Sequence, residues 1–207
     1  MCTRFYIKES DPALTPILEE AVKSPLTSRF HRKAASPLVT SGEVCPTNLA
    51  AAIATNRSGE PAVFPMRWGF ALEGRSAPMV NARVETASEK VLFRELWKAH
   101  RCVIPASWYF EWQQLPAEDG RSRDSTKFAI QPRDSALTWL CGLYRIEDGL
   151  PAFVILTRES GKSVAEIHDR MPLIIPRKAV RAWVNPGKKA EDIIQYAITE
   201  MVAEKAG

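Results

Sequence analysis

The sequence lacks several features that would place it in other classes of protein. It has no apolar run long enough to cross a membrane, and its first residues enter mixed sequence without the apolar core of a signal peptide. The four cysteines lie far apart with no C-x-x-C pair, and only three histidines could assist them, so structural zinc is not expected. We therefore expect a cytoplasmic protein with reduced cysteines and with no metal or other cofactor.

The chain also has little excess of either charge. Its 28 Lys and Arg residues stand against 24 Asp and Glu residues, which gives a formal net charge of +4. This balance permits a polyanionic partner but does not by itself indicate one. The 207 residues are 45% hydrophobic and 25% charged, as in soluble globular proteins. We expect a single domain over residues 1–207 that acts as a monomer.

The spacing of apolar residues predicts helices at both ends of a β-rich middle. Helical spacing occurs over residues 12–23, 88–100, 177–184 and 190–204, and β-like runs occur over 62–70, 101–105, 108–113, 127–131, 137–145 and 153–157. Residues 36–48, rich in Pro, Gly, Ser and Thr, are predicted to form an irregular loop. This order favours an α+β fold, with a mainly antiparallel, barrel-like sheet and flanking helices, over alternating β-α units.

Cys2 is the most informative residue, because an initiator Met is ordinarily removed before a small second residue. Removal of Met1 leaves an amine and a thiol on one residue. These groups titrate near about 7.7–8.0 and about 8.5, so both have a reactive fraction at neutral pH. The amine can form a Schiff base with an aldehyde, and the thiol can close it into a five-membered thiazolidine. The alternative is that position 2 merely holds a small residue.

Two further segments carry polar side chains beside apolar sequence. Asn81 and Arg83 lie between an apolar patch and a predicted helix, where the amide could position a substrate and the guanidinium could hold a phosphate. Glu111 lies between two aromatic residues, and an apolar setting would raise the pKa of its carboxyl and suit it to proton transfer. Equally, Asn81 could form a turn, Arg83 could pair with Glu85, and strand alternation could point Glu111 at solvent.

His168 and Arg170 lie just before the apolar run at 173–175. An imidazole can shuttle protons near neutral pH, and an arginine can contact a phosphate. Trp68, in a predicted strand, could stack on a base. The other interpretation gives His168 a structural role beside a proline turn and buries Trp68 in the core.

Four separated motifs stand in one order along the chain. They are Met-Cys-x-Arg at 1–4, Asn-Ala-Arg-x-Glu at 81–85, Arg-Cys-x-Ile-Pro-Ala at 101–106 with Glu111-Trp112, and Ile-His-Asp-Arg-Met-Pro at 167–172. Together they resemble the SOS-response-associated peptidase family over nearly the whole chain. Two departures from the family pattern are Thr3, where a Gly is common, and Ser107-Trp108, where smaller residues are usual.

The resemblance implies a partner, a chemistry and a fold. The partner is single-stranded DNA that contains abasic sites. Cys2 corresponds to the residue that forms a thiazolidine with the ring-opened sugar, Asn81 to the residue that positions that sugar, and Glu111 and His168 to the acid–base pair. The resemblance also implies a compact α+β fold with a barrel-like sheet and a basic groove.

The resemblance further implies how the chain reaches and holds its partner. Arg4, Arg83 and Arg170 correspond to contacts with the DNA backbone, so the bound protein is expected to be associated with the nucleoid. The peptidase activity in the family's name is the self-removal of the residue that precedes Cys2. A chain that keeps Met1 would have a blocked amine.

Two other functions fit parts of the pattern. The N-terminal-nucleophile amidotransferases and hydrolases also begin with Met-Cys, and their thiol attacks an amide while the α-amine serves as base. The other motifs do not match that class. A non-catalytic module for single strands would need only aromatic and basic side chains. Reaction with an aldehyde and dependence on Cys2 separate the three functions.

Overall fold

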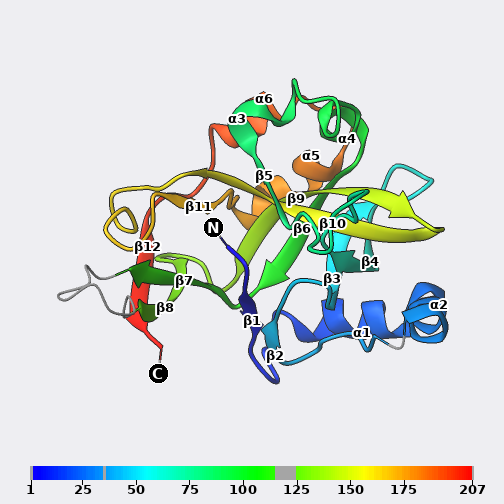
Figure 1. The fold of residues 1–207 in the computed structure, drawn as a ribbon, viewed down its shortest axis with the longest axis horizontal. Helices are drawn as coiled ribbons and strands as arrows, with labels where there is room; N and C mark the ends of the chain where they lie inside the picture. The colour runs from blue at the N-terminus through cyan, green and yellow to red at the C-terminus, as the bar shows by residue number, and fades with distance from the viewer. Residues whose placement is uncertain (1, 35, 115–124, 207) are drawn as a thin grey trace.

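Two β-sheets form the body of the computed structural model, which describes residues 2–34, 36–114 and 125–206 (Figure 1). The first sheet closes on itself as a barrel in these residues. Its ring runs β10 (Leu150–Glu159), β4 (Pro61–Trp68), β3 (Leu49–Thr55), β6 (Arg101–Ala106) and β9 (Thr138–Glu147), and β9 pairs with β10 again. Within the ring, β10 and β4 run parallel and the other pairs run antiparallel. Two short strands, β5 (Asn81–Arg83) and β11 (Arg170–Pro172), pair with β10.

The second sheet is antiparallel, and the chain enters it from the barrel where β7 follows β6. Its order is β12 (Met201–Lys205), β8 (Ser125–Pro132), β7 (Trp108–Gln114), β1 (Phe5–Ile7) and β2 (Gly42–Val44). Ser107, which is buried, forms the bend between β6 and β7. Its N–H donates to the Tyr6 carbonyl at 2.8 Å, and its Oγ accepts the Lys8 N–H at 2.9 Å. The hydroxyl at this position therefore helps to fix β1 against the bend.

Short helices cover the outside of the barrel. They are α1 (Thr15–Lys23), α2 (Pro25–Ala34), α3 (Val84–Ala87), α4 (Arg94–Ala99), the 3-10 helix η1 (Arg177–Ala179), α5 (Val180–Val184) and α6 (Glu191–Ile194). Arg101, which is buried, fastens α4 and α5 to β6 by donating to the Trp97 and Trp183 carbonyls, each at 2.6 Å. Over the described ranges, no helix is both long enough and apolar enough to cross a membrane.

The predicted α+β fold, with a barrel, mostly antiparallel strands and flanking helices, is confirmed. Two predicted helices are wrong in extent. The helix expected over residues 190–204 ends at Ile194, because the Ile198 N–H donates to the Ile174 carbonyl at 2.8 Å and the chain then pairs with β8 as β12. The helix expected over 88–100 begins only at Arg94. The loop predicted over 36–48 contains the short strand β2.

Candidate active site

The segment that leads into β1 lies where the two sheets meet, close to β5, β7 and β11 (Figure 1). The Asn81 side chain, at the start of β5, donates through Nδ2 to the Cys2 carbonyl at 2.8 Å. The pairing of β5 with β10 holds Asn81 in place, with Asn81 opposite Ile155. The Asn81 Oδ1 is buried and accepts no hydrogen bond from the described residues. Asn81 thus fixes the backbone of Cys2 and keeps an acceptor available.

The Cys2 thiol is fully buried and protonated at neutral pH. Burial, and after it the negative charge of Glu111, raise the pKa of the Cys2 thiol far above its ordinary value. The Sγ–H donates to the Arg4 carbonyl at 3.8 Å. The expectation that this thiol has a reactive fraction without further help is therefore wrong. Its addition to an electrophile requires a neighbouring base.

Glu111 on β7 is such a neighbour. It is only 2% exposed, so strand alternation points it inward, and of the two orientations that the sequence left open the buried one is correct. Burial is the main cause that raises the pKa of Glu111 from 4.5 to about 7, and the charge of Asp169 is a smaller contribution to this rise. Near neutral pH this carboxyl exists in both forms. It can therefore both accept and supply a proton.

Tyr109 shares this inward face of β7, two residues before Glu111. Its ring is fully buried, and among the described residues its hydroxyl has no hydrogen-bond partner. Burial, then the negative charges of Cys2 and Glu111, raise the pKa of Tyr109, so the phenol keeps its proton and is a donor. The sequence analysis did not single out Tyr109. Period-two alternation from Glu111 is the signal that could have found it.

His168 lies in the turn that precedes β11. Gln113 on β7 fastens this turn to the second sheet, because its Nε2 donates to the Glu166 carbonyl at 3.0 Å. Burial lowers the pKa of His168, which favours neutral imidazole near pH 7. The Arg170 N–H donates to His168 Nδ1 at 3.0 Å, which leaves the proton of the neutral ring on Nε2.

A second contact of His168, with Asp169, favours a proton on Nδ1 instead. Asp169 Oδ1 lies 2.7 Å from His168 Nδ1, a contact that is favourable only when Nδ1 carries a proton, as in the imidazolium or the neutral Nδ1–H tautomer. The Asp169 side chain is 85% exposed, so water can replace this contact, whereas the turn fixes the Arg170 amide. We therefore assign the neutral form to His168 at neutral pH.

The three arginines expected to contact phosphates differ in their exposure and in their ion-pair partners. Arg83 is exposed and has no ion-pair partner among the described residues. Arg4 donates to Glu43 at 2.8 Å and lies over the Trp112 ring at 5.5 Å, where Lys127 also pairs with Glu43. This group of Arg4, Lys127, Glu43 and Trp112 forms a cationic and aromatic surface on the face of β7 opposite to Glu111. The sequence analysis gave no role to Lys127, which lies in a different strand.

Arg170 is held in a bidentate ion pair. Its two terminal nitrogens donate to the Glu85 carboxylate, each at 2.8 Å, and one also donates to the Thr157 carbonyl. Only 14% of its side chain is exposed. A phosphate at this position would have to replace Glu85, so Arg83 is the most available of the three arginines.

Trp68 does not take the role expected for it. Its ring is fully buried, lies parallel to Phe153 with the ring centroids 6.0 Å apart, and donates through Nε1 to the Val80 carbonyl at 3.0 Å. It cannot stack on a base, and the expectation of a DNA contact there is corrected. Trp108, one of the departures from the family pattern, stacks on Tyr6 with the centroids 4.5 Å apart, so it lies on the face of β7 opposite to Glu111.

The described residues bring together no group of three or more His, Cys, Asp or Glu side chains that could hold a metal ion. The site contains a buried thiol, a carboxyl that titrates near neutrality, a phenol donor and an imidazole. Asn81 contacts Cys2 directly, the charge of Glu111 acts on the Cys2 thiol, and Gln113 holds the turn that carries His168 to β7. Their individual roles stay predictions.

Comparison with known proteins gives one family. The family described as SOS response associated peptidase (SRAP) matches residues 1–206. The abasic site processing protein YoaM of Bacillus subtilis is 34% identical over 140 residues, which are 63% of this chain and 60% of that protein. The corresponding protein YedK of Escherichia coli is 30% identical over 137 residues, which are 62% of this chain and 59% of that protein. The matched segments thus span about 60% of the length of these relatives.

Two solved structures have the same fold. A phage-related protein from Bordetella bronchiseptica superposes with a TM-score of 0.71 at 20% identity, covering 99% of this chain and 94% of that one. A protein from Bacteroides thetaiotaomicron also gives a TM-score of 0.71 at 20% identity, covering 98% of this chain and 92% of that one. At this identity the likeness concerns the fold alone.

Proposed function

This chain belongs to the SOS response associated peptidase family, and from that premise we propose that it recognises abasic sites in single-stranded DNA and captures them covalently through Cys2. Relatives that share about a third of the aligned residues are named abasic site processing proteins, which supports the lesion as the target. The observation that carries the proposal is the position of Cys2. Its carbonyl is held by Asn81, and its thiol is buried beside a carboxyl that titrates near neutrality.

The first step requires the amine of Cys2. Its nitrogen attacks C1′ of the open-chain sugar, a proton moves from nitrogen to the former aldehyde oxygen, and the resulting hydroxyl leaves as water. The product is a Schiff base. Glu111 in its protonated form supplies the proton to the departing hydroxyl, a role supported by its pKa of about 7. Tyr109 is a second donor at the same face of β7.

The second step closes the ring. The thiol sulfur adds to the imine carbon while the electron pair of the C=N bond moves to nitrogen. Because the thiol is protonated, its proton must go to a base, and ionised Glu111 is the nearest candidate by charge interaction. His168 exchanges the proton at nitrogen. The overall change joins an aldehyde and an aminothiol into a thiazolidine with the release of one water, so no oxidant or metal is consumed.

The amine exists only after Met1 is removed. We assign this removal to the chain itself, in keeping with the peptidase in the family's name. The Cys2 sulfur attacks the Met1 carbonyl carbon and forms a thioester while the Met1–Cys2 C–N bond breaks. Glu111 takes the thiol proton and passes it to the departing nitrogen, and water then hydrolyses the thioester and releases Met1. AP-lyase cleavage of the strand is the expected side reaction of the Schiff base, with His168 as the proton-transfer group.

Two sets of cationic side chains support a single strand as the partner, one on β5 near Asn81 and one on the face of β7 opposite to Glu111. Arg83, two residues from Asn81 on β5, is exposed and has no ion-pair partner in the part of the chain that the structure describes. Arg4 and Lys127 surround the Trp112 ring on the second sheet. A cationic track with an aromatic ring suits a backbone whose bases are free to stack.

Replacement of Cys2 tests the proposal. The Cys2→Ser variant keeps the α-amine and a similar volume, so it should form a reversible Schiff base but lose the heat-stable adduct with an abasic single-stranded oligonucleotide. Denaturing gels before and after heating measure this difference. Cys45→Ser is the matched control, since Cys45 is the partly exposed cysteine, and it should crosslink as the wild type does.

Each other outcome selects a different function. Undiminished heat-stable crosslinking by Cys2→Ser rules out the thiazolidine. Equal binding of intact and abasic strands with no adduct in the wild type selects a non-catalytic binding module. Hydrolysis of glutamine without reaction toward the abasic aldehyde selects an N-terminal-nucleophile hydrolase.

A further inference from the structure

The two ends of the barrel interior are filled differently. Residues directly opposite each other in neighbouring strands point to the same side of a sheet. The pairs Ala54 with Cys102, Cys102 with Gly142 and Gly142 with Ile155 therefore mark one continuous interior face. At the end of the barrel near Cys2, this interior is filled by Trp68 and Phe153, which are both fully buried.

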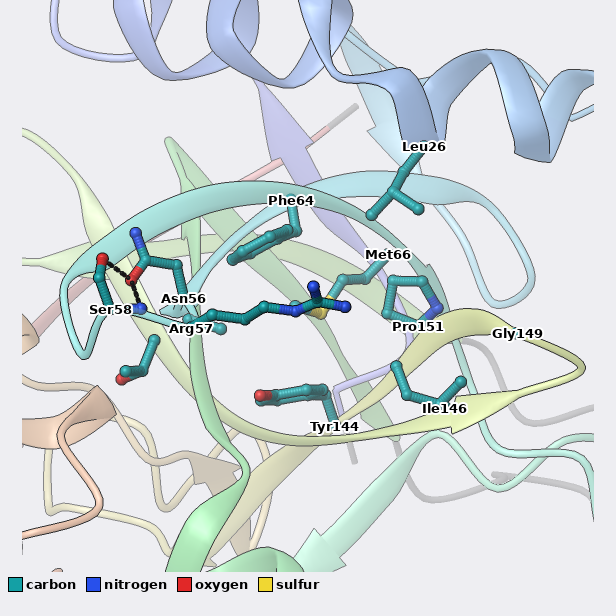
Figure 2. A pocket seen from close by; sticks show the side chains of 12 residues that line it. Leu26, Asn56, Arg57, Ser58, Phe64, Met66, Tyr144, Ile146, Gly149 and Pro151 are labelled. Atoms are coloured by element: carbon teal, nitrogen blue, oxygen red, sulfur yellow. Dashed lines mark hydrogen bonds between the residues drawn. The ribbon is translucent and has the colours of Figure 1, made fainter.

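The opposite end is left open because β3 contributes only small side chains to the interior. Ala50, Ala52 and Ala54 alternate along β3 and face Met66, Phe64 and Ala62 of β4. Ala54, the last of these residues, lines a cavity of about 670 Å³ at the mouth of the barrel, between β4, β9, the β9–β10 hairpin and α2 (Figure 2).

The walls of this mouth are apolar and aromatic. Figure 2 shows Phe64 and Tyr144 on opposite sides of the space, with Met66, Ile146 and Pro151 at one end. Ile146 is 62% exposed, which is unusual for a large apolar side chain that faces a cavity. The mouth of a barrel is a common place for a ligand, and cavities of about 300–1,000 Å³ hold small molecules.

Several polar groups at the rim are already satisfied within the chain. Asn56 Oδ1 accepts hydrogen bonds from the Ser58 hydroxyl at 2.8 Å and from the Glu60 N–H at 3.0 Å. The Thr55 hydroxyl donates to the Val184 carbonyl. A nucleobase has several donors and acceptors on its edge, and these would find few partners here. The ligand that fits has an apolar body.

Arg57 provides the one charge at this mouth. It is the only charged residue that the described part of the chain contributes to the lining, and it has no hydrogen-bond or ion-pair partner among the described residues. Its exposed side chain extends across the opening between Phe64 and Tyr144 (Figure 2). A guanidinium without a counter-ion beside an apolar space is complementary to an anionic group on an apolar molecule.

We propose that the mouth of the barrel binds a small amphipathic carboxylate, with its apolar part among Phe64, Met66 and Tyr144 and its carboxylate paired with Arg57. This site is separate from Cys2, because Trp68 and Phe153 fill the barrel between them. It does not depend on capture of DNA. Octanoate, with octanol as its uncharged match, is a probe of this chemistry.

Titration calorimetry of the full chain with both probes tests the charge requirement. Octanoate should bind at least about tenfold more tightly than octanol, because a charge-assisted hydrogen bond to guanidinium is lost in the alcohol. Arg57→Gln should weaken octanoate by a similar factor and leave octanol unchanged. Arg133→Gln, which removes an exposed charge elsewhere, should leave both unchanged. Equal affinity for the two probes, or an unchanged octanoate affinity in Arg57→Gln, overturns the proposal.

The location is tested by methyl signals of the methionines. In a chain labelled at the methionine methyl groups, octanoate should shift the signal of Met66, which lines the cavity, and not that of Met201 on β12. Ala54→Leu should fill the mouth and abolish the shift, provided that its spectrum remains that of a folded chain. If Ala54→Leu does not fold, the Met66 signal of the wild type still decides the question. Shifts at Met201 alone, or no shift at either residue, contradict the assigned site.

Discussion

At the scale of residues, Glu111 is the side chain that can both accept and supply a proton at the site. Its carboxyl is 2% exposed, and burial raises its pKa from 4.5 to about 7. A carboxyl in this range is close to the pH at which a proton-transfer group works best, because it is present in both forms. The neighbouring thiol depends on it, since the Cys2 pKa is raised and the thiol does not ionise by itself.

Glu111→Gln should slow formation of the crosslink. The amide keeps the shape of the side chain but cannot exchange a proton, and a positioned proton-transfer group contributes about 10²–10⁴-fold to a rate. In the wild type, the observed rate should change around pH 7, following the carboxyl, and this feature should be absent from Glu111→Gln. Single-turnover time courses of adduct formation across pH measure both effects. A wild-type rate in the variant would make Glu111 structural.

The same substitution should raise stability at high pH. The folded-state pKa of Glu111 lies above its ordinary value of 4.5, so the folded chain binds the proton more tightly than the unfolded chain does. The stabilisation from the protonated carboxyl is complete below about pH 4.5 and is lost as the pH rises through about 7. At about 1.4 kcal/mol for each tenfold change in proton affinity, the loss is on the order of 3 kcal/mol.

Thermal unfolding at pH 5 and pH 8 checks this linkage. Glu111→Gln avoids the buried charge, so its unfolding free energy should exceed that of the wild type at pH 8, and the difference should shrink at pH 5. A variant that is less stable than the wild type by the same amount at both pH values would show that the carboxyl is stabilised by contacts rather than strained by burial.

Single residues were predicted from the sequence to different degrees. Cys2, Asn81 and Glu111 could be found, because each stands in a recognisable motif, and the structure brings them together. Trp68 could not be placed correctly, since whether an aromatic ring is buried depends on strands that pair from elsewhere in the chain. Tyr109 was missed because its importance comes from the two groups beside it and from a hydroxyl that has no partner in the described residues.

At the scale of elements, the strands were predictable and the chain ends were less so. The β-like runs between residues 101 and 157 correspond to β6 through β10, whose apolar and β-branched runs are local in sequence even though β6 pairs with β3 and β9. The C-terminal strand β12 could not be predicted, since it depends on pairing with the distant β8. The apolar spacing of the residues before Ile198 is typical of a helix. The hydrogen bond from the Ile198 N–H to the distant Ile174 carbonyl prevents that helix from continuing.

The element β5 makes a prediction about DNA binding. Its last residue, Arg83, is exposed and pairs with none of the described residues, so it should contact a phosphate. The logarithm of non-covalent affinity for single-stranded DNA should fall with the logarithm of salt concentration by roughly 0.7 for each phosphate contacted. Arg83→Ala should reduce this slope by about one such contact.

Fluorescence anisotropy with an intact oligonucleotide over a range of salt concentrations measures the slope. Arg57→Gln is the matched control, because it removes an exposed, unpaired arginine at the opposite end of the barrel. It should keep the wild-type slope. Equal slopes in the wild type and in Arg83→Ala would remove Arg83 from the DNA surface.

At the scale of the whole molecule, the site exists because two sheets meet at one place. Asn81 comes from a strand added to the barrel, and Glu111 comes from the second sheet. The segment that carries Cys2 lies between Asn81 and Glu111. The hydrogen bonds of Ser107 hold β1 against the bend between β6 and β7. None of these contacts is local in sequence. The motifs could therefore predict which residues form the site but not how they lie relative to one another.

Covalent capture through Cys2 is tested most directly by the intact mass of the purified chain before and after incubation with an abasic single-stranded oligonucleotide. Before incubation, the mass should be that of the chain without Met1. Afterwards, a heat-stable species should appear whose mass is the sum of chain and oligonucleotide less one water, as ring closure on Cys2 requires. A chain that has lost Met1 but gives no such species, or an adduct that forms while Met1 is still present, would contradict capture through the Cys2 amine and thiol.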